Sequence, residues 1–154
     1  MTTPPTPPAA PAPEAWGAAG GDQREMVPAL ARVARLAAAS TGAPWAMVNF
    51  TAPGGFRVGA AYGLLDAQDA GVTVAASAVP CAGPATSGEP LVCADAQADP
   101  ELASRAGVRA LGIRGYLGVP FRDRLGRVAG TVCVMTLEPR AWTADDLERM
   151  QDLA

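Results

Sequence analysis

Hydrophobic residues are densest between Arg114 and Met135, and this stretch predicts two long strands joined by a tight turn. Apolar side chains fill nearly every position of Gly115–Arg122 and Arg127–Met135, as expected for strands in the middle of a sheet that is covered on both faces. Between them, Asp123–Gly126 has turn chemistry, because its glycine can take the positive φ that a hairpin loop requires. We therefore expect a central antiparallel pair around which the chain folds.

An amphipathic helix is predicted over Arg24–Ser40. The apolar positions that recur on one face are Leu30, Val33, Ala34 and Ala37. Because Pro28 is tolerated only near a helix start, we expect the regular helix to begin close to Val27, and Gly42 and Pro44 to end it. This face packs on the core or, with its small residues, on a second helix in a dimer.

A closing helix is predicted from a capping motif. Thr143 and Asp146 have capping-box spacing, with Asp in place of the usual Glu. The residues on one side of the helix are Leu147, Met150 and Ala154, with Leu153 beside them. Two arrangements stay open, because this stripe can pack on the sheet of its own chain or on a partner's helix.

Two further strands follow the first helix. Trp45–Thr51 and Phe56–Tyr62 flank a Pro-Gly-Gly turn and predict a hairpin. In the second strand, alternation is expected to give one apolar face, formed by Phe56, Val58, Ala60 and Tyr62.

The middle of the chain is weakly patterned. A loop is expected from Leu64 to Val79, with a short strand near residues 72–75, and Pro80–Ser87 is a short helix or an irregular turn. Leu91–Cys93 is a short strand. Asp99 then caps a helix that has Pro100 at its first position and ends by Gly107, and residues 108–113 lead into the hairpin. A helix at each end of the domain sequence, with antiparallel strands between them, predicts an α+β domain.

Composition separates residues 1–22 from a single domain at residues 23–154. Met1–Pro13 has six prolines in thirteen residues, and we expect the whole segment to be a disordered Pro/Ala-rich arm. It lacks the pattern of a signal peptide. The chain has no apolar run long enough to span a membrane, and three widely spaced cysteines favour a reducing cytoplasm.

Charge and residue usage exclude several functions. The net charge is −3, and the arginines are interleaved with acids, so no nucleic-acid partner is expected. Histidine is absent, which removes His-based acid–base catalysis, the Ser-His-Asp and Cys-His nucleophiles and His-rich metal sites. Without a Cys-x-x-Cys pair, no metal and no cofactor is expected.

The ordered motifs of the second half resemble the GAF domain family, as found in bacterial signalling proteins with sensor kinases and phosphatases. SGEPLVCADAQADPEL (Ser87–Leu102) is similar to the family's Gly-Glu-Pro step, short strand and Asp-Pro. LGIRGYLGVPFRDRLGRVAGTVCVM (Leu111–Met135) is similar to its two central strands, and EPRAWTADDLERMQDLA (Glu138–Ala154) to its closing helix. The resemblance covers about residues 25–154.

The resemblance implies a five- or six-stranded antiparallel sheet in a GAF/PAS-like arrangement. The first and last helices would lie on one face and often form a dimer bundle, and short helices and loops would cover the other face and enclose a small-molecule pocket. It thus implies a non-catalytic sensing or regulatory domain that acts through a homodimer or a signalling partner protein. A ligand-free dimerisation scaffold is the alternative.

An enzymatic branch of the family reduces free methionine sulfoxide with thiols, which makes it the second alternative. Such chemistry needs an accessible thiolate and a second cysteine within reach. The loop that carries the attacking cysteine in that branch corresponds here to Glu101–Arg105, which has no cysteine, and Cys133 reads as a packed core residue. Bilin chromophore and cyclic-nucleotide binding are disfavoured, because the chain has neither histidine nor lysine.

If the family pocket is present, its lining should come from the inner face of the sheet and the covering segment between Leu64 and Arg109. The candidate ligand-binding residues are Phe50, Tyr62, Ser77, Cys81, Asp95, Arg114 and Tyr116. Each also has a structural explanation, as core packing for the aromatic residues and as local hydrogen bonding for the charged ones. Tyr116 has the strongest case, because a central-strand tyrosine needs a partner for its hydroxyl.

Overall fold

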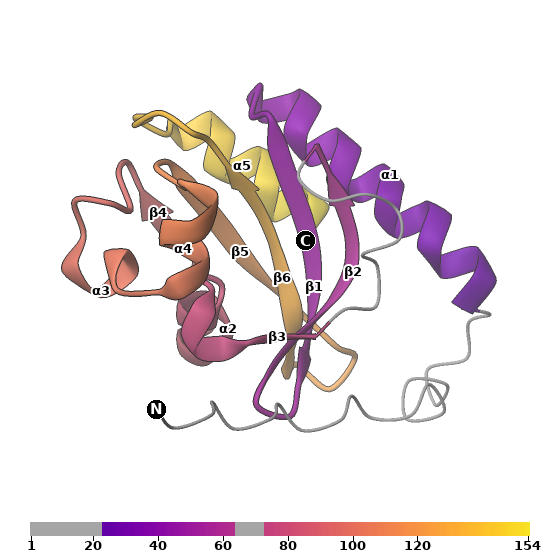
Figure 1. Cartoon of the computed structure of the whole chain (residues 1–154). Helices are drawn as coiled ribbons and strands as arrows, with labels where there is room; N and C mark the ends of the chain where they lie inside the picture. Colours follow the sequence, from indigo (N-terminus) through magenta and orange to yellow (C-terminus); the bar gives the residue numbers. More distant parts are fainter. Residues whose placement is uncertain (1–22, 64–72) are drawn as a thin grey trace.

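The computed structural model describes residues 23–63 and 73–154 (Figure 1), with the side chains of residues 23–27 left out. The expected N-terminal arm therefore lies outside the described residues, as do residues 64–72 of the expected loop. The elements, in chain order, are α1 (Gln23–Thr41), β1 (Trp45–Ala52), β2 (Gly55–Tyr62), β3 (Thr73–Ala75), the 3-10 helix η3 (Ala76–Ala78), α2 (Ala82–Ser87), β4 (Leu91–Cys93), α3 (Pro100–Ala103), α4 (Ala106–Leu111), β5 (Tyr116–Arg122), β6 (Val128–Met135) and α5 (Ala144–Leu153).

The strands form one six-stranded antiparallel sheet in the order β3-β2-β1-β6-β5-β4. The β5–β6 hairpin is confirmed, and Gly126 has a φ of +79° in its turn. The two middle strands are β1 and β6, however, because β1 pairs with the free edge of β6. The expectation of a central hairpin therefore holds for β6, whereas β5 lies one strand from the edge.

Two hydrophobic layers cover the two faces of the sheet. On one face α1 and α5 pack side by side (Figure 1), over a core that includes Ala34, Val48, Val134 and Met150. On the other face the short elements between β3 and β5 cover a second core around Phe56, Val108, Tyr116 and Cys133. The α+β prediction is confirmed, with terminal helices on one face and short helices on the other.

The first helix begins earlier than its sequence predicts. It starts at Gln23 rather than close to Val27, so Pro28 lies inside the helix. The N–H groups of the first turn of a helix have no partner within the helix. Pro28 lies just beyond that turn, so it removes only one backbone hydrogen bond near the helix start. At the other end Gly42 takes a φ of +71° and terminates the helix, as predicted.

A β-bulge changes which side chains of β2 share a face. The β1–β2 register shifts between Val48 and Asn49, where Gly59 has no partner on β1. Phe56 therefore packs in the core under the short helices, whereas Ala60 packs with α1. The prediction of one apolar face on this strand was wrong, because one extra residue inverts the alternation beyond it.

Two short helices, not one, lead into β5. Asp99 caps α3 as predicted, and its Oδ1 accepts hydrogen bonds from the backbone N–H groups of Glu101 (3.0 Å) and Leu102 (3.1 Å). The sequence analysis missed α4, which follows at once and buries Val108 completely. Its apolar pattern is too short for periodicity to reveal.

The capping box of α5 is present, with reciprocal hydrogen bonds between Thr143 and Asp146. Of the two arrangements left open for this helix, packing within the chain is observed, because α5 contacts α1, β5 and β6. Met150 is fully buried, but Ala154 is exposed and does not extend the apolar stripe. Among the described residues, none of the helices has the length and apolarity that a membrane crossing requires.

Candidate functional site beneath the short helices

Three central strands bring polar side chains together under the short helices. Asn49 of β1 lies directly opposite Thr131 of β6, and both are buried. Two residues further along β6, on the same face, Cys133 lies opposite Gly118 of β5. Since side chains two residues apart share a face, these positions form a polar strip across an otherwise apolar layer.

Tyr116 reaches into this strip from the start of β5. Its side chain is fully buried, and a Cβ atom added to Gly118 would lie only 2.3 Å from the tyrosine oxygen. The ring therefore lies across Gly118, and only glycine leaves room for it. Burial raises the pKa of Tyr116 well above its ordinary value, and the neighbouring Cys133 and Cys81 add to this effect.

Cys81 lies in the covering layer, directly before α2, and packs against the polar strip of the sheet. The Nδ2 group of Asn49 donates a hydrogen bond to its sulfur over 3.8 Å. Burial raises the pKa of the Cys81 thiol to about 12, although the charge of Arg105 and the neighbouring polar side chains of Thr131 and Asn49 act in the opposite direction. The thiol is therefore protonated at neutral pH.

Arg105, between α3 and α4, brings a positive charge to the site. Its Nη1 donates to the carbonyl oxygen of Ala76 (2.9 Å), and its Nη2 forms an ion pair with Glu101 (3.3 Å). The arginine side chain is 16% exposed and that of Glu101 is 80% exposed, so the ion pair lies at the solvent end of the guanidinium. Its positive charge acts to lower the pKa values of both Cys81 and Tyr116.

We call these six residues the buried polar cluster: Asn49, Cys81, Arg105, Tyr116, Thr131 and Cys133. Four of its side-chain atoms are buried and have no hydrogen-bond partner among the described residues, namely Asn49 Oδ1, Arg105 Nε, Tyr116 Oη and Thr131 Oγ1. A buried polar group without a partner costs about 1–3 kcal/mol, so native proteins rarely keep several in one place. The cluster thus offers unused donors and acceptors to a bound molecule.

The structure brings together two of the seven candidate residues from the sequence, Cys81 and Tyr116. Arg114 and Asp95 instead form a two-pronged ion pair, with Nε–Oδ1 and Nη2–Oδ2 distances of 2.7 Å, at the end of the sheet. The hydrogen bonds from Arg114 hold the pKa of Asp95 below its ordinary value. This pair joins the turn after β4 to the residues that precede β5.

The other three candidates lie elsewhere. Phe50 is on the α1 face of the sheet, where its ring packs edge-on against Phe121 with 5.6 Å between the ring centroids. Tyr62 at the end of β2 is 44% exposed, and Ser77 in η3 is exposed. These three positions do not contribute to the buried polar cluster.

Sequence reasoning missed Asn49, Thr131 and Arg105. Asn49 and Thr131 are polar residues within largely apolar strand sequences, WAMVNFT and AGTVCVM, and this mismatch was an available indication. Arg105 had no such indication, because nothing in the sequence of α3 and α4 shows that its charge acts on Cys81 and Tyr116.

The three cysteines are free thiols, and no described residues form a group that could hold a metal ion. Cys133 is buried next to Tyr116, and burial raises the pKa of its thiol far above the ordinary value. Burial also raises the pKa of Cys93, which is partly exposed at the end of β4. The chemistry of an activated thiolate is therefore unfavourable at all three positions.

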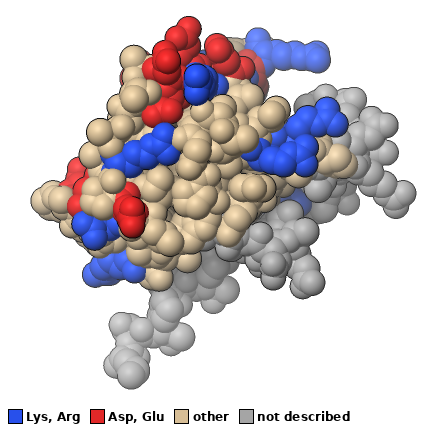
Figure 2. All heavy atoms as spheres, turned by 90° about the horizontal axis from the view of Figure 1, so that it is seen from above, with Lys and Arg blue, Asp and Glu red and all other residues tan. Residues whose placement is uncertain are grey.

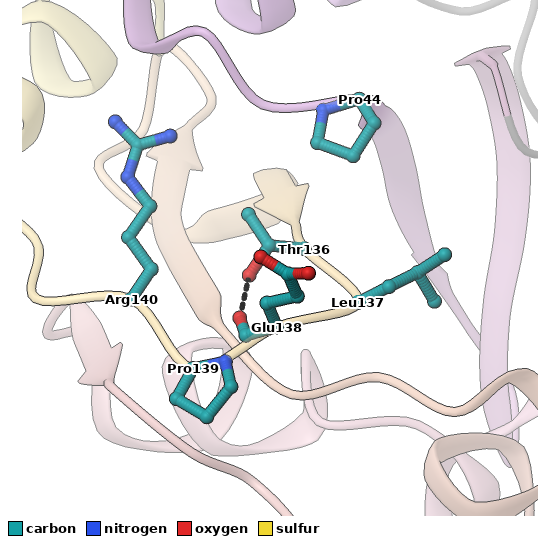
Figure 3. Close-up of a pocket in the computed structure, with 6 residues that line it drawn as sticks. All are labelled: Pro44, Thr136, Leu137, Glu138, Pro139 and Arg140. Atoms are coloured by element: carbon teal, nitrogen blue, oxygen red, sulfur yellow. Dashed lines mark hydrogen bonds between the residues drawn. The ribbon is translucent and has the colours of Figure 1, made fainter.

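A surface hollow of about 350 Å³ lies at the other end of the molecule from α2, beyond β6 (Figure 3). Its lining residues are Pro44, Thr136, Leu137, Glu138, Pro139 and Arg140. Two of the polar side chains here, those of Thr136 and Arg140, are already engaged. The hydroxyl of Thr136 donates to the carbonyl oxygen of Glu138 (2.7 Å), and Arg140 contacts Thr41, Asp146 and the ring of Trp142. These contacts join the end of α1 to the start of α5, so the hollow serves the fold.

Comparisons with known proteins agree with this architecture. The GAF domain of an Acinetobacter phosphoenolpyruvate-protein phosphotransferase is similar in structure, with a TM-score of 0.69, 15% sequence identity and coverage of 83% of this chain and 76% of that one. A type II free methionine-R-sulfoxide reductase from Thermoplasma acidophilum has a TM-score of 0.68 and 14% identity, covering 86% and 89%. The PixJ GAF domain of Thermosynechococcus elongatus in its blue-light-absorbing form has a TM-score of 0.67 and 17% identity, covering 85% and 81%.

At these identities the three structures show the fold alone. No curated protein matches the sequence. The family model described as "GAF domain" matches residues 25–154, which include every element from the body of α1 to the end of α5. The chain therefore belongs to the GAF domain family.

Proposed function

We propose that this chain is a non-catalytic sensing module that binds a small molecule at the buried polar cluster. The observation that carries this proposal is the set of four buried, unpaired polar atoms from three strands and the covering layer. A ligand that pairs with them would recover the desolvation cost of each atom. It would also tie the short helices to the sheet, since Cys81 and Arg105 belong to the cover and the other cluster residues to the strands.

For the output, we propose a homodimer through α1 and α5 in the cytoplasm. The exposed side of α1 carries Arg32 and Arg35 beside Leu36, which is 46% exposed. The exposed side of α5 carries three acidic residues, Asp145, Glu148 and Asp152, and one arginine, Arg149, whose Nη1 donates to the carbonyl oxygen of Ser40 at the end of α1 (2.8 Å). Figure 2 shows charged side chains of both signs toward the rim of the face seen from above, with uncharged surface between them. Opposite charges on the two helices favour contact of α1 in one copy with α5 in another.

The ligand-free scaffold is the alternative from a different class. In that case the unpaired atoms only lower the stability of the fold, and the protein functions solely through dimerisation of the face formed by α1 and α5. Native mass spectrometry of the protein purified from its own host tests both parts of the proposal. A retained small molecule together with a dimeric mass is the expected result. A ligand-free protein that no small molecule stabilises against heat would establish the scaffold instead.

The raised pKa values of the three thiols in this chain argue against the alternative of a methionine sulfoxide reductase. At neutral pH a thiol whose pKa is about 12 presents almost no thiolate, so Cys81 is a poor nucleophile. The direct test is thiol-dependent turnover of free methionine sulfoxide by the purified chain. We expect no turnover above the level of a Cys81→Ser variant. Robust activity that this substitution abolishes would show that the chain is an enzyme.

A further inference from the structure

Residues 98–112 form a loop whose two ends meet. They contain α3 and α4, and the residues on either side of them are joined by polar contacts. The carboxylate of Asp95 holds the guanidinium of Arg114 in the two-pronged ion pair, with both distances at 2.7 Å. The Nε2 group of Gln97 donates a hydrogen bond to the carbonyl oxygen of Ile113 (3.1 Å). We call residues 98–112 the flap, and residues 95–97 with residues 113–114 its neck.

The neck is fixed to the end of the sheet by backbone hydrogen bonds. The N–H group of Arg114 donates to the carbonyl oxygen of Thr136, and the N–H group of Thr136 donates to that of Gly115, both over 2.9 Å. From the other side, the N–H group of Arg140 donates to the carbonyl oxygen of Ala94 (2.9 Å). Because Thr136 and Arg140 follow β6, these bonds tie the neck to the central strands. The neck therefore provides a firm point about which the flap can turn.

The far end of the flap rests on η3. The Nη1 group of Arg105 donates a hydrogen bond to the carbonyl oxygen of Ala76 (2.9 Å). A Cβ atom added to Gly107 would lie 2.5 Å from the carbonyl oxygen of Ala78, so the backbones of α4 and η3 approach closely here. The main packing partners of α4 are α3 and η3, and Figure 1 shows α3 and α4 on the side of the molecule that carries β4. The flap thus bridges the covering layer from the edge strand β4 to the residues that follow the opposite edge strand β3.

The underside of the flap contributes two buried side chains to the core beneath it. Leu102 and Val108 belong to the same core as Tyr116, whereas Leu111 at the end of α4 is 42% exposed. Lifting the flap therefore exposes much less apolar surface than unfolding the whole domain. It also lets water pair with the Nε–H group of Arg105, which is buried without a partner among the described residues. Partial openings of this kind cost less free energy than global unfolding.

We propose that the flap turns about its neck while the sheet stays folded, and that Arg105 is the latch that keeps it closed. The side chain of Arg105 is 16% exposed, so water can replace Ala76 as its partner when the latch releases. The strand residues Asn49, Tyr116 and Thr131 of the buried polar cluster are at most 1% exposed, so a small molecule reaches them only when the cover moves. The use of the opening as an entry route rests on the proposed sensing function, whereas the movement itself does not.

Labelling of the full chain with iodoacetamide, followed by mass spectrometry, tests the movement. Val108→Cys places a thiol under the flap, and Val48→Cys places one under α1 on the other face of the sheet; both valines are at most 2% exposed. We expect the thiol at position 108 to react at least about tenfold faster than the thiol at position 48. Low concentrations of urea should hardly change the first rate and should raise the second steeply. Equal rates with the same dependence on urea would overturn the proposal, because the flap would then open only with the whole domain.

Arg105→Met tests the latch, because methionine keeps an apolar side chain of similar length and removes the hydrogen bond to Ala76. In the Val108→Cys chain it should raise the rate of labelling by about tenfold, as expected for the loss of one charge-assisted hydrogen bond. Arg109→Met is the matched control, because Arg109 is an exposed arginine of α4, and it should change the rate less than about twofold. Near-ultraviolet circular dichroism establishes that each variant is folded. An unchanged rate in Arg105→Met would refute its role as the latch.

Gly107→Ala tests the same contact without a change of charge. The new methyl group meets the carbonyl oxygen of Ala78, so this variant should also accelerate labelling at position 108, although alanine favours the helix itself. Neither Gly107→Ala nor Arg105→Met should accelerate labelling of Val48→Cys to the same extent. Equal acceleration at both positions would mean that the substitutions only weaken the whole domain, and it would overturn the latch.

The outcomes separate this inference from the proposed function. If native mass spectrometry finds a retained molecule but Val108→Cys is labelled only through global unfolding, the sensing module stands and the flap is wrong. If the flap opens separately and the protein neither retains a molecule nor is stabilised by one, the flap stands and the sensing function fails.

Discussion

Replacing Tyr116 with phenylalanine should stabilise the ligand-free protein. The substitution removes a hydroxyl that is fully buried and has no hydrogen-bond partner among the described residues, and it keeps the ring that lies across Gly118. An unpaired buried hydroxyl costs about 1–3 kcal/mol, and we take the lower end of this range because the polarisable thiol of Cys133 lies next to the hydroxyl. We therefore expect a gain of about 1 kcal/mol in the free energy of unfolding.

Equilibrium unfolding in urea measures this gain, with the midpoint shifted and the slope unchanged. For a domain of this size, the same gain raises the melting temperature by about 3–5 °C. Tyr62→Phe is the matched control, because Tyr62 is 44% exposed and its change should stay within about 0.5 kcal/mol. A loss of about 1 kcal/mol or more in Tyr116→Phe would refute the reasoning, since it would mean that the hydroxyl is well paired in the folded protein. With a ligand that bonds to the hydroxyl, the same substitution should lower affinity while it raises stability.

Three further expectations follow from single contacts. Gly118→Ala should lower the free energy of unfolding in urea by about 1–3 kcal/mol, because the new methyl group meets the Tyr116 ring. In a chain that also carries Tyr116→Leu, the cost of Gly118→Ala should be smaller. An equal cost with tyrosine and with leucine at position 116 would contradict the close approach. Burial raises the pKa of Asp146, but hydrogen bonds from Thr143 and the charge of Arg140 outweigh it and hold that pKa below the ordinary value. The resulting stability is present above the unfolded pKa of about 3.9 and is lost as pH falls through the folded pKa. Asp146→Asn should therefore lose less melting temperature than the natural sequence below about pH 4. An identical fall of melting temperature with pH in both proteins would exclude this assignment. Cys93, the one partly exposed thiol, should react with iodoacetamide before Cys81 when labelling is followed by mass spectrometry, and faster labelling of Cys81 would mean that its pKa is not raised.

Local sequence determined the parts of the fold that depend on neighbouring residues. The Asp99 cap, the capping box at Thr143 and the Gly126 turn each place a hydrogen-bonding or flexible residue at a fixed offset, so a short window contains the whole cause. The bulge at Gly59 and the helix α4 were missed for the opposite reason. Gly59 is excluded from the register by pairing with β1, and α4 is held by burial of Val108 against distant residues.

The candidate site depended still more on tertiary structure. Tyr116 and Cys81 were identified from the sequence as candidate ligand-binding residues, but so were Arg114 and Asp95, which instead pair with each other at the sheet end. Nothing in the order of residues distinguishes these two outcomes. Tyr116 is on β5 itself beneath the covering layer, whereas Arg114 precedes that strand and Asp95 follows β4, so the ion pair lies beyond the end of the sheet.

By itself, then, the sequence of this protein determined its family, its α+β class and the caps and turns that delimit its elements, because these are set by local chemistry and by an ordered series of motifs. Only the tertiary structure decided that Asn49, Thr131 and Arg105 join Tyr116 and Cys81 in one buried cluster. Strand register brings the first two together across β1 and β6, and Arg105, at the start of α4, belongs to the covering layer and acts on Cys81 and Tyr116 through its charge. Long-range pairing is a property of the whole chain, and no short stretch of sequence encodes it.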